Sequence, residues 1–247
     1  MGAMPEEIES LLPLLTNRTE RSIGGRIYYA GELHGKNIVM AFSRWGKVAA
    51  ASTATTMLQA YGITDLLFTG VAGAIDANLK TGDIVIAEKL IQHDLDARPI
   101  MAQHEIPLLG KTWIETDPVW RARLTHSVNQ VINQKILNSL VGEAALKNFD
   151  IHSPGLYTGE IASGDQFFRS KEQKLALQQL LPHILCVEME GAAVAQVCYE
   201  NDLRFAVVRT ISDASDEKSV IDFPAFINKI ASHYSVAILD HLFRQDW

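Results

Sequence analysis

The sequence predicts an α/β fold with a central mixed, mostly parallel sheet flanked by helices. Short apolar runs alternate with segments in which apolar residues recur every three or four positions, which is typical of strands joined by helices. The runs are almost continuously apolar, which indicates strands covered on both faces. With 247 residues, 47% of them hydrophobic, the chain can bury a large core and is expected to form one domain, residues 1–247.

The strands are predicted where a short apolar run is bounded by glycine, aspartate or other polar residues. In chain order they are Ile38–Phe42, Leu66–Thr69, Ile84–Ala87, Ile184–Val187 and Phe205–Ile211. The helices are predicted where the apolar spacing is three to four residues. They are Val48–Ala60, Lys171–Leu180, Ala192–Glu200 and Phe223–Leu242. We expect further helices between Asp117 and Phe149, and a long loop at Ile91–Gly110.

Composition restricts the classes of partner. The net charge is −7 and the 22 basic residues are scattered, which argues against a surface for nucleic acid or anionic membranes and favours a small-molecule ligand. No apolar run approaches the length of a membrane span and no secretory leader is present, so the expected location is the cytoplasm. Cys186 and Cys198 lack metal-site spacing, which predicts free buried thiols and no metal.

Polar motifs follow three of the predicted strands. They are TGVAGA at 69–74, the glutamates of VEMEG at 187–191, and Ser212-Asp213. Ligands of parallel sheets gather at the carboxyl ends of strands, so these motifs should converge. Each also has an ordinary interpretation: the glycines turn the chain, Ser212-Asp213 caps a helix or forms a turn, and Glu188 and Glu190 lie in a solvated turn. Glu7, after Pro5, is likewise explained as an acid in the first turn of a helix.

Seven segments together are more informative than any of them alone. They are GAMPEE at 2–7, SRWGKVAAA at 43–51, TGVAGA at 69–74, TGDIV at 81–85, SGDQFF at 163–168, VEMEGAAVA at 187–195 and VRTISDAS at 208–215. In this order they resemble the 5′-methylthioadenosine/S-adenosylhomocysteine nucleosidases of the nucleoside phosphorylase superfamily. The resemblance implies a nucleoside phosphorylase-like fold, hydrolysis of the N-glycosidic bond to release adenine, no cofactor, and a homodimer.

The resemblance also implies catalytic roles. Asp213 matches the general acid that protonates the purine, and Ser212 would orient it. In this role Asp213 would have to stay protonated or share a proton. Glu7 matches the carboxylate that activates water on the opposite face of the sugar.

Binding roles follow from the same resemblance. Glu190 matches the residue that accepts hydrogen bonds from the ribose hydroxyls, Phe167 the ring that stacks on adenine, and Phe168 the backbone that contacts the edge of the base. Ala72 and Gly73 would approach the ligand closely. An apolar pocket for the 5′ group would be lined by Met4, Trp45, Phe167, Met189 and Phe223. Glu188 is expected behind the site, and Arg209 would contact either the ribose or a site carboxylate.

The chain departs from the family pattern in three places. Family members begin with a hydrophobic strand before GAM, whereas this chain starts with Met1 there, so we expect that strand to be missing. Val71 stands where the family has serine. The loop at 94–107, which crosses to the neighbouring subunit's 5′ pocket in the family, has different chemistry here, with Arg98, Gln103 and His104.

Three alternatives to the main hypothesis are kept open. The first is a nucleosidase for another 5′-substituted adenosine, such as aminodeoxyfutalosine or futalosine. The second is a nucleoside phosphorylase, although the charge of Glu6 and Glu7 would repel phosphate. The third is a non-catalytic nucleoside-binding relative.

Overall fold

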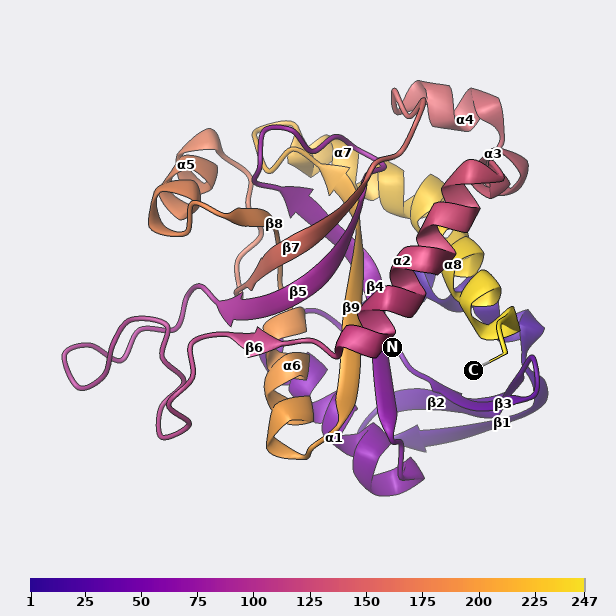
Figure 1. Cartoon of the computed structure of the whole chain (residues 1–247), viewed down its shortest axis with the longest axis horizontal. Helices are drawn as coiled ribbons and strands as arrows, with labels where there is room; N and C mark the ends of the chain where they lie inside the picture. Colours follow the sequence, from indigo (N-terminus) through magenta and orange to yellow (C-terminus); the bar gives the residue numbers. More distant parts are fainter. Residues whose placement is uncertain (247) are drawn as a thin grey trace.

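The computed structural model describes residues 1–246, so Trp247 of the expected 1–247 domain lies outside the described residues. A six-stranded sheet has the order β6-β5-β7-β8-β4-β9, and β5 also pairs with β9, so the sheet curves back on itself (Figure 1). The long pairings β4–β9, β5–β7 and β7–β8 are parallel, which confirms the predicted mixed, mostly parallel sheet. Its strands are β4 Asp65–Ala74, β5 Ile84–Gln92, β6 Ile114–Glu115, β7 Leu156–Ser163, β8 Ile184–Glu188 and β9 Arg204–Asp213.

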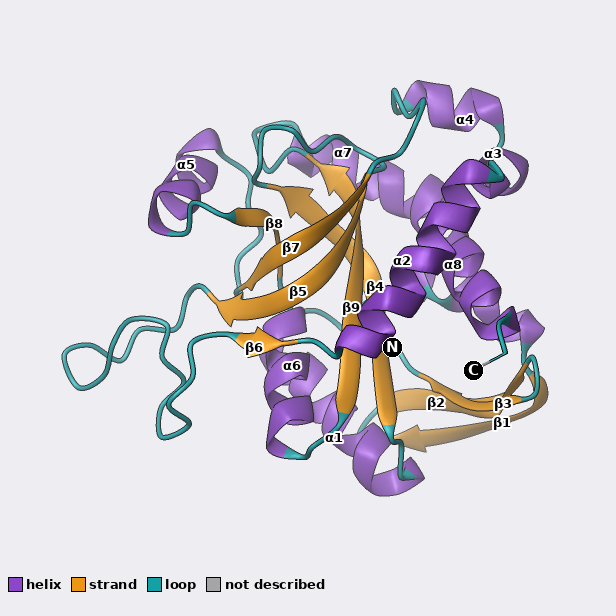
Figure 2. Ribbon diagram, in the orientation of Figure 1, coloured by secondary structure: helices purple, strands orange, loops and turns teal. Residues whose placement is uncertain are grey.

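Helices flank this sheet as predicted (Figure 2). Helix α1 packs against α6, and α2 packs against α8. The helices are α1 Lys47–Tyr61, α2 Pro118–Asn133, α3 Ile136–Val141, α4 Glu143–Asn148, α5 Lys171–Leu180, α6 Gly191–Glu200, α7 Ser219–Phe226 and α8 Ser232–Arg244. None of the helices between residues 1 and 246 has the length and apolar character that crossing a membrane requires.

The predicted helix Phe223–Leu242 is wrong in one respect, because it is not a single regular helix. Helix α7 begins four residues earlier, and a π-helical turn at Ile227–Ala231 separates it from α8. Pro224 lies inside α7 and has no N–H to donate to the preceding turn. Wider turns of this kind occur where the regular hydrogen-bond ladder is interrupted.

A second, three-stranded antiparallel sheet was mostly missed by the sequence pattern. It consists of β1 Thr16–Ile23, β2 Arg26–Leu33 and β3 Lys36–Met40, and only β3 was predicted. Strand β1 has the sequence TNRTERSI, and seven of its eight residues are exposed. Because it has no apolar face, the alternation that marks a half-buried strand is absent.

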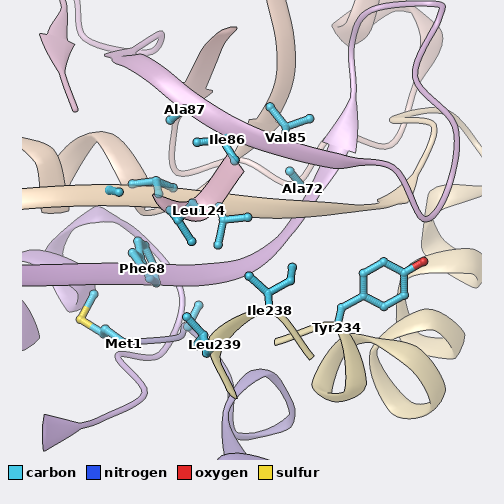
Figure 3. Packing of buried hydrophobic residues seen from close by; sticks show 14 of the residues in the cluster. Met1, Phe68, Ala72, Val85, Ile86, Ala87, Leu124, Tyr234, Ile238 and Leu239 are labelled. Carbon is cyan, nitrogen blue, oxygen red and sulfur yellow. The ribbon is translucent and has the colours of Figure 1, made fainter. Parts of the chain in front are cut away.

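Met1 and Gly2 join the two sheets. The α-amino group of Met1 donates to the Leu67 carbonyl (2.8 Å), and Gly2 forms a parallel bridge with Phe42 beyond the end of β3. Among the described residues, this bridge and two short 3₁₀-helical segments, Pro5–Glu7 and Glu9–Leu14, precede β1. The side chain of Met1 lies in the same buried cluster as Phe68 and Leu239 (Figure 3). A cavity of about 740 Å³, lined in part by β3 and β4, adjoins Met1.

Three predicted boundaries change at the edge of the sheet where the motifs lie. The TGVAGA segment belongs to β4 and does not form a turn after it, so the turn interpretation of its glycines is wrong. Strand β9 continues through Asp213. Strand β5 continues to Gln92, so the loop after it begins at His93, later than predicted.

Candidate active site

One cavity lies where β4, β8 and β9 end near the N-terminal segment. The structure brings all twelve predicted site residues to its wall: Met4, Glu7, Trp45, Ala72, Gly73, Phe167, Phe168, Met189, Glu190, Ser212, Asp213 and Phe223. Six further residues complete the wall: Ala3, Val71, Gln166, Val187, Glu188 and Ser215. The three motifs that were expected to converge therefore do so.

Glu7 reaches the cavity from a single turn of 3₁₀ helix, Pro5–Glu7. Its Oε2 accepts hydrogen bonds from the backbone N–H groups of Ala3 (2.5 Å) and Met4 (3.0 Å), and its Oε1 accepts one from Val71 (3.3 Å). Its side chain is buried, and burial raises the pKa of Glu7, while the positive charge of Arg209 and the three backbone amides act in the opposite direction. The first-turn interpretation is sufficient for Glu6, which lies outside the cavity wall, but not for Glu7.

The glycines of β4 leave space for two carboxylates. A Cβ atom on Gly70 would lie 2.7 Å from Glu7 Oε1, and one on Gly73 would lie 3.2 Å from Asp213 Oδ1. Three residues along a strand span about 10 Å. Glu7 and Asp213 therefore approach the same strand at two points separated by a distance suited to a small ligand.

Asp213 is the last residue of β9 and is 3% exposed. The Ser212 hydroxyl donates to its Oδ2 (2.7 Å), and the Ser215 N–H donates to its Oδ1 (2.9 Å). The second bond is the kind that an aspartate makes in a turn, so the turn interpretation describes the local geometry correctly. The same carboxylate also lines the cavity, so the two interpretations are compatible.

Glu190 lies at the junction of β8 and α6 and is 6% exposed. Its Oε1 accepts a hydrogen bond from the Gly46 N–H (2.7 Å), which ties the segment before α1 to the cavity. Burial, together with the charge of Glu188, raises the pKa of Glu190 to about 8. The solvated-turn interpretation of the two glutamates is therefore wrong, because both are buried.

Glu188 holds this junction in place. It accepts hydrogen bonds from the backbone N–H groups of Glu190 (3.1 Å) and Gly191 (2.8 Å) and from the Ser163 hydroxyl. Arg209 donates to its Oε2 (2.7 Å) and is not part of the cavity wall. Of the two contacts expected for Arg209, the structure has the one to a site carboxylate.

Aromatic rings form the open side of the cavity. The Phe223 ring lies 5.4 Å from that of Phe167 and 6.1 Å from that of Trp45, measured between ring centroids, with edge-to-face geometry in both pairs. Trp45 is 57% exposed, so its ring is available to a ligand or a partner surface. Phe168 lies deeper and packs edge-to-face on His93 at 5.4 Å.

The loop at 94–107 does not contribute to the cavity wall of its own chain. The segment between β5 and β6 extends away from the body of the molecule (Figure 1). Within it Arg98 pairs with Asp96 (2.5 Å), His104 is buried, and Ile100 is 89% exposed.

Sequence reasoning did not single out Ser215 or Gln166, although both lie within segments of the family resemblance. Nothing in the residues themselves marks their side chains as part of the wall, because that depends on how the chain turns after β9 and β7. Val71 was noted only as a replacement for serine. Its backbone N–H nevertheless donates to Glu7, a contact that does not depend on the side chain.

The comparisons with known proteins agree with this geometry. The family model described as "Phosphorylase superfamily" matches residues 1–244. The chain belongs to this superfamily.

Within the superfamily, its relatives are nucleosidases. An aminodeoxyfutalosine nucleosidase of Helicobacter pylori is 36% identical over 94% of this chain and 91% of its own length. A 5′-methylthioadenosine/S-adenosylhomocysteine nucleosidase of Staphylococcus epidermidis is 33% identical over 94% and 92%. The Neisseria meningitidis enzyme of the latter name, solved with methylthio-immucillin-A, superposes with a TM-score of 0.85 at 29% identity, covering 98% of this chain and 96% of that one. This chain is therefore a member of the nucleosidase family, whose enzymes cleave N-glycosidic bonds.

Proposed function

We propose that this chain, as a single nucleosidase domain over residues 1–247, hydrolyses 5′-methylthioadenosine and S-adenosylhomocysteine and releases adenine. The observation that supports this most strongly is the pair of buried carboxylates, Glu7 and Asp213, in one cavity against β4. Two carboxylates on opposite sides of a glycosidic bond are the arrangement that hydrolysis requires. Similarity to nucleosidases along nearly the whole chain supports the same reaction class.

In this proposal Asp213 is the general acid. Cleavage leaves positive charge on the ribose and sends electrons into the purine, so a proton delivered to N7 of the base makes it a better leaving group. The Ser212 hydroxyl, bonded to Asp213 Oδ2, fixes the orientation of the carboxyl group. Ala72 and Gly73 of β4 provide the backbone wall beside it.

Glu7 activates the water that attacks the sugar from the other face. Its Oε1 and Oε2 are held by backbone amides, which keeps the carboxylate in one orientation. Glu190 accepts hydrogen bonds from the ribose hydroxyls, and these bonds strengthen as positive charge grows on the ring. Met189 packs beneath the sugar.

Water is the expected nucleophile because of the charge of the wall. Among the described residues, the wall contains Glu7, Glu188, Glu190 and Asp213 and no lysine or arginine. A phosphate ion would therefore find no cation in this wall to bind it. The nearby Arg209 is already paired with Glu188.

The base and the 5′ group are assigned to the aromatic part of the wall. Phe167 would stack on adenine and the backbone of Phe168 would contact its edge. Met4, Trp45 and Phe223 would surround an apolar 5′ substituent. Aminodeoxyfutalosine is a second candidate substrate, because the relatives at 36% and 37% identity are named for it.

We also propose a homodimer in which the 94–107 loop reaches the neighbouring subunit's 5′ pocket. The extension of this loop away from its own cavity and the exposure of Ile100 support that arrangement (Figure 1). Sedimentation equilibrium tests it: a monomer at micromolar concentration would contradict the proposal.

Adenine release, measured with and without inorganic phosphate on a panel of 5′-substituted adenosines, tests the proposed reaction. We expect release from the methylthio and homocysteinyl compounds at a rate that phosphate does not change. A phosphate-dependent rate would indicate a phosphorylase, and tight binding without release would indicate a non-catalytic relative. Faster release from aminodeoxyfutalosine than from the other compounds would favour the second substrate.

A further inference from the structure

Ser215 has no role in the reaction as proposed so far, although it lines the cavity. Its side chain is 1% exposed, and its Oγ has no hydrogen-bond partner among the described residues. A buried hydroxyl without a partner is unfavourable, so such groups are normally satisfied. Because this one faces a cavity, we expect its partner to be the molecule that fills the cavity.

The backbone at Ser215 is held in an unusual conformation. Its φ angle is +55°, in the left-handed region that residues with a Cβ atom seldom adopt. In this conformation its N–H donates to Asp213 Oδ1 (2.9 Å), so the chain folds back onto the proposed general acid. Backbone strain of this kind is often found at functional sites.

The hydroxyl and the carboxylate face the same point of the wall. A Cβ atom on Gly73 would collide with Ser215 Oγ and would lie 3.2 Å from Asp213 Oδ1. Because Gly73 has no side chain, the Ser215 Oγ and the Asp213 carboxylate can both approach β4 at this position. When one atom of a ligand contacts Asp213 at this position, the ligand atoms next to it lie within reach of the Ser215 hydroxyl.

We propose that the Ser215 hydroxyl binds the substituent on C6 of the purine. This rests on the proposed function, in which Asp213 protonates N7. On that edge of a purine N7 lies between C8–H and the substituent on C6, and of these two the substituent is the one that forms strong hydrogen bonds. A serine hydroxyl accepts from a 6-amino group and donates to a 6-oxo group, so Ser215 favours bases with either substituent over a purine with hydrogen at C6.

The experiment compares three substrates with different groups at C6: the 5′-methylthio derivatives of adenosine, of inosine, which also carries a proton on N1, and of unsubstituted purine riboside. Ser215→Ala and Ser215→Gly both remove the hydroxyl, but glycine also suits the left-handed backbone. We expect both variants to lose kcat/KM about three- to tenfold on the 6-amino and 6-oxo substrates, the usual effect of one neutral hydrogen bond. On the substrate with hydrogen at C6 we expect no change.

Thermal unfolding separates binding from a structural role. Because the hydroxyl has no protein partner, Ser215→Ala should unfold at the same or a higher temperature than the unmodified chain. Equal losses on all three substrates, no loss on any of them, or a destabilised Ser215→Ala variant would overturn the proposal.

Failure of the proposed function would be recognised separately, because the unmodified chain would then release no base from any of the three substrates. Calorimetric titration with free adenine and free purine would decide the role of Ser215 in that case. A preference for adenine that both variants abolish supports the proposal, and a preference unchanged by the variants overturns it.

Discussion

Arg209 Nη2 lies 2.7 Å from Glu188 Oε2, and the two side chains are 1% and 2% exposed. The Arg209 guanidinium also lies 4.1 Å from the centroid of the Phe68 ring, so it is enclosed on that face as well. Glu188 in turn accepts the backbone N–H groups at the start of α6. This buried pair therefore fixes the segment that positions Glu190.

The first prediction concerns the stability of this pair. Glu188→Gln leaves the Arg209 charge buried without its counter-charge, and breaking a buried pair in this way typically costs about 3–5 kcal/mol. We expect a loss of this size in the free energy of unfolding, measured by urea denaturation.

The matched control for this variant is Glu160→Gln. Glu160 pairs with Lys89 (3.0 Å), and their side chains are 18% and 31% exposed. A pair near solvent contributes about 0–1 kcal/mol. Similar losses for the two variants would show that burial of the Arg209–Glu188 pair does not determine its contribution.

The second prediction concerns the activation of water. Glu7→Gln keeps an oxygen for the backbone amides but removes the negative charge, so we expect kcat to fall by a factor of about 10²–10⁴. Nucleoside binding, measured by calorimetry, should persist. Glu6→Gln, at the neighbouring position outside the cavity wall, should retain full activity. If both variants turned over substrate at the rate of the unmodified chain, Glu7 would not be the base.

These two residues also show how far the sequence could be interpreted. Glu6 and Glu7 are equivalent acids after a proline, and only the family resemblance selected Glu7. What places its side chain in the cavity is a set of contacts with residues 3, 4 and 71, a pattern that spacing alone does not encode. The main strands, by contrast, are buried on both faces, so they could be recognised in the sequence as short apolar runs.

The missed features have a common physical cause. Strand β1 is stabilised by backbone pairing with β2, not by an apolar face, so its sequence resembles that of a loop. The ordinary interpretation of the β4 glycines was that they turn the chain, whereas in the structure they leave room for Glu7 and Asp213. In both cases the decisive interaction leaves no mark in the apolar pattern: backbone pairing across the β1–β2 hairpin for one, and contacts of β4 with Glu7 and Asp213 for the other.

The third prediction concerns the proton donor. Asp213→Asn retains hydrogen-bonding groups beside Ser212 but cannot supply an acidic proton to the base. We expect adenine release to fall by a factor of about 10²–10⁴, the range typical of general acid–base groups. A substrate with a much better leaving group than adenine, such as a nitrophenyl riboside, should lose less. Unchanged adenine release by this variant would refute the proposed mechanism.

The fourth prediction concerns the α-amino group of Met1, which donates to the Leu67 carbonyl. Burial lowers the pKa of this group from 8.0 to about 5. Between these values the unfolded chain binds more protons than the folded one, so this group makes stability rise with pH from about 5 to 8.

Acetylation of Met1 removes the titrating amine and leaves an amide N–H in its place. The cavity that adjoins Met1 provides room for the added group. A shift of one pKa unit corresponds to about 1.4 kcal/mol, so the blocked chain should be more stable by up to about 4 kcal/mol near pH 5, and this advantage should vanish near pH 8. Glu7 and Glu190 have raised pKa values, so they make stability fall as the pH rises. The quantity to measure is therefore the difference in the free energy of unfolding between the acetylated and the unmodified chain, by urea denaturation at each pH. A difference that stays constant from pH 5 to 8 would show that the Met1 amine is not the titrating group.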